Sequence, residues 1–188
     1  MKTVLHVGCG PYDPKKLHST FRSHDWREVR LDINETVAPD ILASLTDMSA
    51  IESASMDAVW SSHNVEHLYA HEVPVALREF RRVLKADGFA LITLPDLQKI
   101  AEWVAQDKLE DVAYHSRAGA IAPIDMIYGH RNSIARGNVF MAHKTGFTAK
   151  TLGNALIKAG FARAKVKRGQ NFDLWAIAYK TIPSSEIA

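Results

Sequence analysis

Histidines stand beside glycines and acidic residues at three places in this 188-residue sequence, which contains 9 histidines in all. An imidazole in such a setting can move a proton or bind a metal. One group is His63-Asn64-Val65-Glu66-His67, and the other two are Tyr128-Gly129-His130-Arg131-Asn132 and Met141-Ala142-His143-Lys144-Thr145-Gly146. We expect the last two segments to form a substrate wall, with His143 as the first choice for a general base and His130 as the second. The alternative is that each is an ordinary loop histidine.

The first histidine group also spells H-x-x-E-H, a motif of zinc enzymes, at His63, Glu66 and His67. On a helix this spacing places two imidazoles one turn apart beside a glutamate. His71 would be the third ligand, but Val73-Pro74 disfavours the continuous helix that would align it. The motif also follows a predicted strand directly, so we expect no metal. His63 and His67 then contact the cofactor or the substrate, or satisfy backbone groups where a strand becomes a helix.

A glycine turn near the N-terminus indicates a cofactor site. Residues 4–7 form a short apolar run that leads directly into Gly8-Cys9-Gly10. Glycines in such a turn let a ligand approach the backbone closely. A second predicted strand ends at Asp32, where a carboxylate can accept hydrogen bonds from a ribose. Together the turn and the acid predict an adenosine cofactor, whereas the glycines alone are also compatible with a purely structural turn.

Position 13 distinguishes between two adenosine cofactors. A dinucleotide-binding turn needs a third glycine here, so that a helix N-terminus faces the pyrophosphate. The sequence has Asp13 instead, whose carboxylate would repel phosphate, and residues 11–14 (PYDP) are a poor helix start. S-Adenosylmethionine carries a sulfonium cation and no phosphate, so it tolerates an acidic and aromatic rim. The sequence therefore favours S-adenosylmethionine over NAD.

Short apolar runs alternate with helical patterns along the chain, which is typical of a parallel α/β sheet. Periodic apolar residues predict helices over Pro74–Ala86 and Ala149–Ala159. Strands are predicted over Thr3–Val7, Glu28–Asp32, Asp40–Ala43, Met56–Ser61, Phe89–Leu94, Ala162–Lys167 and Leu174–Tyr179.

The segment between the fifth predicted strand and the last predicted helix is unusually long. Connections in compact domains have a median of roughly 4–6 residues, and this one has about fifty. It contains a helical pattern around Ile100–Gln106. We expect one domain over residues 1–188, in which residues 96–144 form an insertion that covers the substrate.

The order and spacing of several short motifs resemble the class I S-adenosylmethionine-dependent methyltransferases of the small-molecule group called type 11. The resemblance covers nearly the whole chain. It implies a Rossmann-like, seven-stranded α/β sheet, mostly parallel with the last strand antiparallel, and helices on both faces. The motifs are Leu5-His6-Val7-Gly8-Cys9-Gly10, Arg30-Leu31-Asp32, Asp47-Met48, Met56-Asp57-Ala58-Val59-Trp60-Ser61-Ser62-His63, Glu66-His67-Leu68, Phe80-Arg81-Arg82-Val83-Leu84-Lys85 with Gly88, and Gly146-Phe147-Thr148 through Ala159-Gly160-Phe161.

The resemblance implies a role for each part of the cofactor site. The glycine turn would lie beneath the methionine part and Asp32 on the ribose hydroxyls. Asp47 and the Met48 backbone would lie at the adenine edge, and Ser62 and His63 near the sulfonium. The expected cofactor-binding residues are Gly8, Cys9, Gly10, Asp32, Ile33, Asp47, Met48, Ser62, His63 and His67.

The sequence departs from the family pattern at two positions. The family usually has an acid where His6 stands and a further glycine where Tyr12 stands. These departures predict a short or remodelled first helix, and they put the contact to the cofactor's amino group in question.

Composition excludes several other classes of function. The formal net charge of +2 gives no reason to expect a nucleic-acid partner, and no apolar stretch is long enough to span a membrane. A single cysteine is typical of a reducing compartment, so we expect a cytoplasmic protein. The predicted function is methyl transfer from S-adenosylmethionine to a small-molecule acceptor, at oxygen rather than carbon or nitrogen. The alternatives are a nucleotide-dependent dehydrogenase and a cofactor-binding module without turnover.

Overall fold

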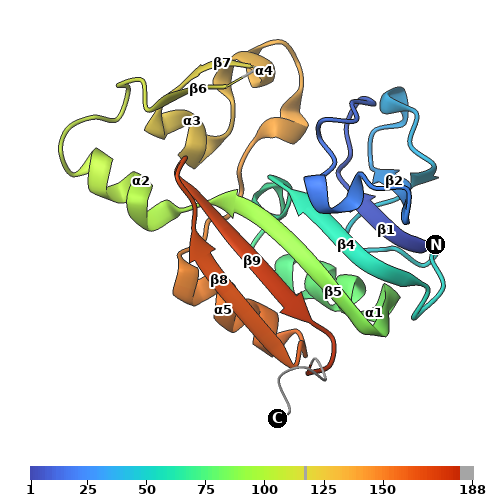
Figure 1. Ribbon diagram of the computed structural model, residues 1–188. Coiled ribbons are helices and arrows are strands. Elements are labelled where there is room, and N and C mark those ends of the chain that lie inside the picture. Colours follow the sequence, from blue (N-terminus) through green and yellow to red (C-terminus); the bar gives the residue numbers. More distant parts are fainter. Residues whose placement is uncertain (117, 183–188) are drawn as a thin grey trace.

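The computed structural model describes residues 1–116 and 118–182 and is built on a seven-stranded sheet (Figure 1). The strand order is β3-β2-β1-β4-β5-β9-β8. All neighbouring strands run parallel except β9, which is antiparallel to both β5 and β8. The predicted Rossmann-like fold class with its antiparallel last strand is confirmed, although of the helices expected on both faces only a short 3₁₀ helix lies on the second face among the described residues. The strands are β1 (Lys2–Val7), β2 (Trp26–Asp32), β3 (Ile41–Leu42), β4 (Met56–Ser62), β5 (Leu84–Pro95), β8 (Arg163–Arg168) and β9 (Asp173–Tyr179).

Two α-helices cover one face of the sheet, behind the strands in Figure 1. They are α1 (Val73–Val83) and α5 (Ala149–Lys158). Side chains that alternate along the strands, such as Leu5 and Val7 of β1, pack against them in the main apolar core. Alternation of this kind sends every second side chain to the same face, because the pleat has a period of two.

Among the described residues, the other face of the sheet carries a short 3₁₀ helix, η1 (Ser19–Phe21), and an aromatic cluster. Phe21 packs there edge-on against Trp26, and Trp60 stacks on Trp175 with ring centroids 5.9 Å apart. Between β1 and β2, which the structure describes without a gap, η1 is the only helical element. The expectation of a short or remodelled first helix is thus confirmed.

The helix predicted over Pro74–Ala86 ends earlier than the sequence suggested. The observed α1 stops at Val83, and Leu84 is extended (φ −69°, ψ 140°) and pairs with Met56 as the first residue of β5. The prediction was wrong over three residues because it placed the helix stop at Asp87-Gly88. The chain begins to pair with β4 at Leu84, four residues before Gly88.

The long segment after β5 forms a separate group of small elements beyond the carboxyl end of that strand (Figure 1). Ile100, Ile121, Met126 and Phe172 form an apolar cluster of their own there. The two ends of the segment meet, because the Leu97 N–H donates to the Phe147 carbonyl at 2.9 Å. Its elements are α2 (Leu97–Val104), β6 (Tyr114–Ser116), β7 (Gly119–Ile121), α3 (Pro123–Tyr128), α4 (Arg131–Ala135) and η4 (Val139–Met141).

Two further 3₁₀ helices follow β2 and β4: η2 (Glu35–Val37) and η3 (Val65–His67). Among the described residues, no helix combines the length and the apolar character needed to cross a bilayer.

Candidate functional site

The glycine turn after β1 has the backbone geometry that the sequence predicts. Gly8 and Gly10 have φ of 60° and 59°, in the left-handed region that favours glycine. A Cβ on Gly8 would lie 2.1 Å from the Asn64 amide nitrogen, so the Asn64 side chain packs directly against the turn. Cys9 between them is 2% exposed, and burial raises the pKa of its thiol. Cys9 is therefore a buried neutral thiol and not an activated nucleophile.

Asp32, at the end of β2, lies against this turn. One carboxylate oxygen accepts from the Gly10 N–H at 2.8 Å, and the other accepts from the Asn34 N–H at 2.9 Å. The residue is 9% exposed. Each carboxylate oxygen offers two lone pairs, so both can still accept another hydrogen bond. The next residue, Ile33, is 56% exposed and lies on the protein surface next to Asp32.

These residues fit S-adenosylmethionine. The Asn64 amide nitrogen is buried at the turn and has no hydrogen-bond partner among the residues that the structure describes. An unpaired buried donor of this kind suits the anionic end of an amino acid. Asp32 supplies acceptors for ribose hydroxyls. The space next to Gly8 is taken by the Asn64 side chain, so a cofactor would meet that amide rather than the Gly8 backbone. The donor, the acceptor and the turn are therefore all present in one place.

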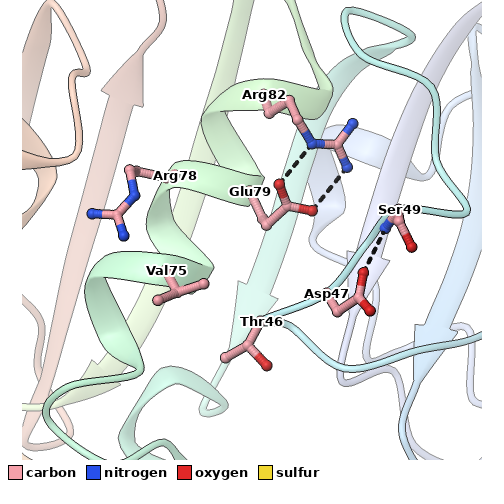
Figure 2. Close-up of a pocket in the computed structure, with 7 residues that line it drawn as sticks. All are labelled: Thr46, Asp47, Ser49, Val75, Arg78, Glu79 and Arg82. Carbon is pink, nitrogen blue, oxygen red and sulfur yellow. Dashed lines mark hydrogen bonds and ion pairs between the residues drawn. The ribbon is translucent and has the colours of Figure 1, made fainter.

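Asp47 and Met48 lie in the loop between β3 and β4. Asp47 lines a hollow of about 460 Å³ between this loop and α1 (Figure 2), whereas Met48 is fully buried. The Arg82 guanidinium in this hollow forms hydrogen bonds of 2.6 and 2.8 Å with Glu79. Arg82 also donates to the Met48 carbonyl, and the Met48 N–H donates to Glu79 at 2.9 Å.

These charges fix the loop to the helix, and the hydrogen bond from Arg82 lowers the pKa of Glu79. The Met48 N–H thus already has a protein partner. A contact between this pair of residues and adenine stays a prediction.

The segment after β4 turns sharply towards the long insertion. Ser62 ends the strand, and His63 has φ of 49°, a left-handed value that is uncommon outside glycine. The His63 N–H donates to the Thr93 carbonyl of β5 at 2.8 Å. Glu66 and His67 follow on the three-residue helix η3. The H-x-x-E-H motif therefore lies on a strand-to-3₁₀ turn and not on the long helix of zinc proteases.

Glu66 is the most unusual ionisable residue of the fold. It is 1% exposed, and within residues 1–116 and 118–182 neither carboxylate oxygen has a hydrogen-bond partner. The His63 ring forms an ion pair with Glu66 when protonated, with Nδ1 3.3 Å from Oε1. Burial alone would raise the pKa of Glu66, but the neighbouring imidazoles, His63 first, outweigh it and lower that pKa. The same pair raises the pKa of His63 despite the opposing effect of burial.

His143 comes from the far end of the insertion and meets this segment. Its ring packs edge-on against His67, with ring centroids 4.9 Å apart. The Nδ1 atoms of His67 and His143 lie 3.0 and 2.8 Å from the carbonyls of Ala142 and Met126. Burial lowers the pKa of His143, which favours the neutral imidazole. The segment is held in place by the Lys144 N–H, which donates to the Glu66 carbonyl at 2.8 Å.

A cavity of about 250 Å³ opens at this point, at the carboxyl end of β5. Its wall is mostly apolar and is supplied largely by the insertion and the segment after it, with Glu66, Tyr128, His143 and Lys144 as the ionisable groups. His130 is not part of the wall; its Nδ1 lies 2.8 Å from the Ser133 hydroxyl. The lining residues are Glu66, Pro95, Leu97, Met126, Ile127, Tyr128, His143, Lys144, Thr145, Gly146 and Phe147.

The structure thus brings the predicted residues together in two places. Gly8, Cys9, Gly10 and Asp32 meet at the turn, whereas His67 packs against His143, which lines the cavity. Sequence reasoning missed Asn64, because nothing in its neighbourhood shows that it packs on a glycine more than fifty positions away. The sequence did indicate Glu66, as part of the zinc-like motif. The structure adds that the Glu66 side chain is almost completely buried.

A family model described as a methyltransferase domain matches residues 5–92. This range begins in β1 and ends in β5, so it includes the glycine turn, Asp32, Asn64 and Glu66. No curated protein sequence matches the chain significantly.

Solved structures share the fold. The citrinin polyketide synthase CMeT domain aligns with a TM-score of 0.63 at 13% identity, over 97% of this chain and 47% of that one, so the present chain spans about half its length. A SAM-dependent methyltransferase from Methanosarcina mazei aligns at 0.60 with 18% identity, over 96% and 93% of the two chains. The 1,6-didemethyltoxoflavin-N1-methyltransferase of Burkholderia thailandensis, solved with 1,6-didemethyltoxoflavin and S-adenosylhomocysteine, aligns at 0.56 with 14% identity, over 96% and 71%.

Proposed function

We propose that this chain, a member of the class I S-adenosylmethionine-dependent methyltransferases, transfers the cofactor's methyl group to an oxygen atom of a small molecule. The observation that carries the proposal is the position of one short segment. Residues 62–67 place Asn64 on the glycine turn and, two residues later, Glu66 in the wall of the cavity. The segment therefore connects the place of the cofactor with a chamber for an acceptor.

The cofactor is held by the residues around the glycine turn. Asp32 accepts hydrogen bonds from the ribose, and the Asn64 amide donates to the amino-acid end. Ile33 would border the adenine with Asp47 and Met48, while Ser62, His63 and His67 would lie on the side of the sulfonium. When bound, S-adenosylmethionine supplies an electrophilic methyl carbon.

A small molecule is the acceptor that suits the cavity. Its volume of about 250 Å³ is below the usual range for drug-sized ligands, about 300–1,000 Å³. The mostly apolar wall would hold the acceptor in one orientation, which can contribute about 7–11 kcal/mol to catalysis.

An oxygen acceptor agrees with the ionisable groups in the wall. A hydroxyl must lose its proton to become a strong nucleophile, and Glu66 and His143 are the groups placed to promote that loss. We assign His143 to the acceptor oxygen. His130 remains the second choice, because its ring is bonded to Ser133 in the neighbouring loop and would need to turn to reach the cavity.

Calorimetric titration with S-adenosylhomocysteine tests cofactor recognition, with NAD as the competing ligand. We expect heat of binding from S-adenosylhomocysteine alone. Incubation with S-adenosylmethionine and a panel of hydroxyl-bearing small molecules then tests turnover, measured as S-adenosylhomocysteine released. Binding without release across the panel would favour the module without turnover, and binding of NAD alone would refute the assignment.

Asp32→Ala is expected to weaken S-adenosylhomocysteine binding by about 10- to 100-fold, because hydrogen bonds to a charged acceptor contribute about 1.5–3 kcal/mol. Asp40→Ala is the matched control, since Asp40 is exposed and also accepts a backbone hydrogen bond, from the Arg30 N–H at 2.7 Å. Calorimetry compares the two variants with the unaltered protein. Equal affinities in all three would show that Asp32 does not bind the ribose.

A further inference from the structure

We propose that Glu66, His67 and His143 form a binding site for a divalent transition-metal ion, with Zn²⁺ as the ion that fits the ligands best. One ligand atom from each residue lies within 4.8 Å of the other two. Two imidazoles and one carboxylate are a common ligand set for such ions, and it leaves coordination positions open for another molecule. The site stands on this geometry, whereas its use in catalysis rests on the proposed function.

Both imidazoles are oriented as metal ligands are. The Nδ1 atoms of His67 and His143 are occupied by the carbonyls of Ala142 and Met126. Donation from Nδ1 to a carbonyl fixes the tautomer in which Nε2 carries the lone pair. Metal-bound histidines almost always have such a partner on the second nitrogen. Each ring therefore presents a ready Nε2 donor, and the edge-on packing of the two rings keeps them together.

The Glu66 carboxylate supplies the independent observation. It is 1% exposed, and among the residues with described positions neither oxygen has a hydrogen-bond partner. Burying a charge without a partner is costly, and buried carboxylates are normally paired, hydrogen-bonded or bound to a metal. The half-exposed His63 ring forms an ion pair with one of the Glu66 oxygens, Oε1, at 3.3 Å, and among the described residues Oε2 has no hydrogen-bond partner. A divalent cation between Glu66 and the two other rings would satisfy this charge.

The third ligand comes from a different part of the chain than the sequence motif suggests. By spacing alone, His71 would complete the site. In the structure His71 is exposed and stacks on Tyr69, whereas His143 reaches Glu66 from the end of the insertion. The site therefore exists only when the insertion is folded against the segment after β4.

The open side of the site faces the acceptor. Glu66 and His143 both line the 250 Å³ cavity, so a molecule there can reach an ion that they hold. A bound cation lowers the pKa of a hydroxyl that it coordinates. The acceptor hydroxyl would lose its proton to water, and its oxygen would form the new bond to the methyl carbon as the carbon–sulfur bond breaks. In this arrangement His143 acts as a ligand and not as the general base expected from the sequence.

The test is titration of the chelator-treated full chain with Zn²⁺ in competition with a chromophoric chelator, and with Co²⁺ followed by visible absorption. We expect one tight site per chain and a Co²⁺ spectrum with ligand-field bands of a low-symmetry nitrogen and oxygen environment. His143→Ala and Glu66→Gln should weaken Zn²⁺ binding by about 100-fold or more, since even loss of an outer partner costs about 10- to 100-fold.

Two control variants separate this site from surface binding. His71→Ala removes the ligand that the sequence spacing suggests, and His24→Ala removes an exposed imidazole that lies 3.4 Å from Asp25. Both should keep the affinity for Zn²⁺. Loss of binding in His71→Ala with retention in His143→Ala would overturn the proposal, and so would the absence of tight binding to the unaltered chain.

Failure of this proposal is distinguishable from failure of the proposed function. Each variant is also titrated with S-adenosylhomocysteine, whose proposed site at the glycine turn contains neither Glu66 nor His143, the two ligands that are altered. This titration shows whether a variant is folded. Cofactor binding without Zn²⁺ binding refutes the metal site alone, whereas Zn²⁺ binding without cofactor binding refutes methyl transfer and leaves the metal site standing.

Discussion

Gly129 has φ of 96° and pairs in an antiparallel bridge with Ala142, directly before His143 in the chain. A Cβ on Gly129 would lie 1.9 Å from the Met141 carbonyl oxygen and 2.9 Å from the Ala142 Cα. Both neighbours are backbone atoms, so they cannot turn aside as a side chain would. Gly129 therefore helps to fix the position of the segment that carries His143.

Gly129→Ala is expected to weaken Zn²⁺ binding by about tenfold or more, because it pushes the His143 segment away from Glu66. Gly137→Ala is the matched control: its φ of 92° imposes similar strain, about 1–3 kcal/mol, but a Cβ there meets nothing within 4 Å. Competition titration measures the affinity, and urea unfolding measures the stability of both variants. Equal losses of Zn²⁺ affinity in the two would mean that Gly129 does not position His143.

At the same scale, sequence reasoning succeeded where chemistry depends on local spacing. Gly8, Gly10 and Asp32 are recognisable because a bare turn after one strand and an acid after the next imply a common place at the sheet edge. It did not bring Glu66 and His143 together, because their contact joins positions far apart in the chain. No local pattern encodes such a pairing.

Among the elements, three strands are tied together by Asp57 of β4. Its carboxylate accepts from the Thr3 N–H of β1 at 2.7 Å and from the Lys85 ammonium of β5 at 2.8 Å. Burial alone would raise the pKa of Asp57, but the hydrogen bonds from Lys85 and Thr3 outweigh it and hold that pKa below the ordinary value. The ionised carboxylate thus stabilises the amino-terminal edge of the sheet, away from the site.

Asp57→Asn is expected to lower the free energy of unfolding by about 1–3 kcal/mol, with cofactor affinity unchanged. Because the folded-state pKa is depressed, the contribution is fully present above the ordinary pKa of 3.8 and disappears as the pH falls below it. Urea unfolding at neutral pH and in acid checks this, and the two proteins should converge in acid. Asp87→Asn, on an exposed residue of β5, is the control and should change little. A constant difference at all pH values would contradict the assignment.

The sheet and both helices of its covered face were predictable because buried parallel strands produce continuous apolar runs. The elements of the insertion were not predictable, apart from the helical pattern around Ile100–Gln106, which overlaps α2. Its elements are short, and its cluster depends on Phe172, which lies in the loop before β9 and joins Ile100 from a distant part of the sequence. The end of α1 was also misplaced, since pairing of Leu84 with Met56 outweighs local helix propensity.

For the molecule as a whole, the two proposed ligands bind at separate places on the same folded chain. The cofactor site belongs to the sheet, whereas the metal site joins the sheet to the insertion. Ligands that bind only the folded state raise its stability by mass action. Their effects on thermal unfolding should therefore be measurable separately.

S-Adenosylhomocysteine at 100 times its dissociation constant is expected to raise the melting temperature by about 5–11 °C, from a stabilisation of about 2.7 kcal/mol and about 2–4 °C per kcal/mol for a chain of this size. Scanning calorimetry measures the shift, with Asp32→Ala as the variant that should lose most of it. A shift with NAD and none with S-adenosylhomocysteine would contradict the cofactor assignment.

The meeting of Leu97 and Phe147 across one hydrogen bond makes the insertion a closed excursion from the sheet. Its chain leaves and returns at neighbouring points, so lengthening or replacing it demands no change in how β5 pairs with β9. The sheet with its glycine turn is thus structurally separable from most of the insertion. If the proposed function holds, exchanging the insertion while His143 keeps its place should change the preference for the acceptor and leave cofactor binding unaltered.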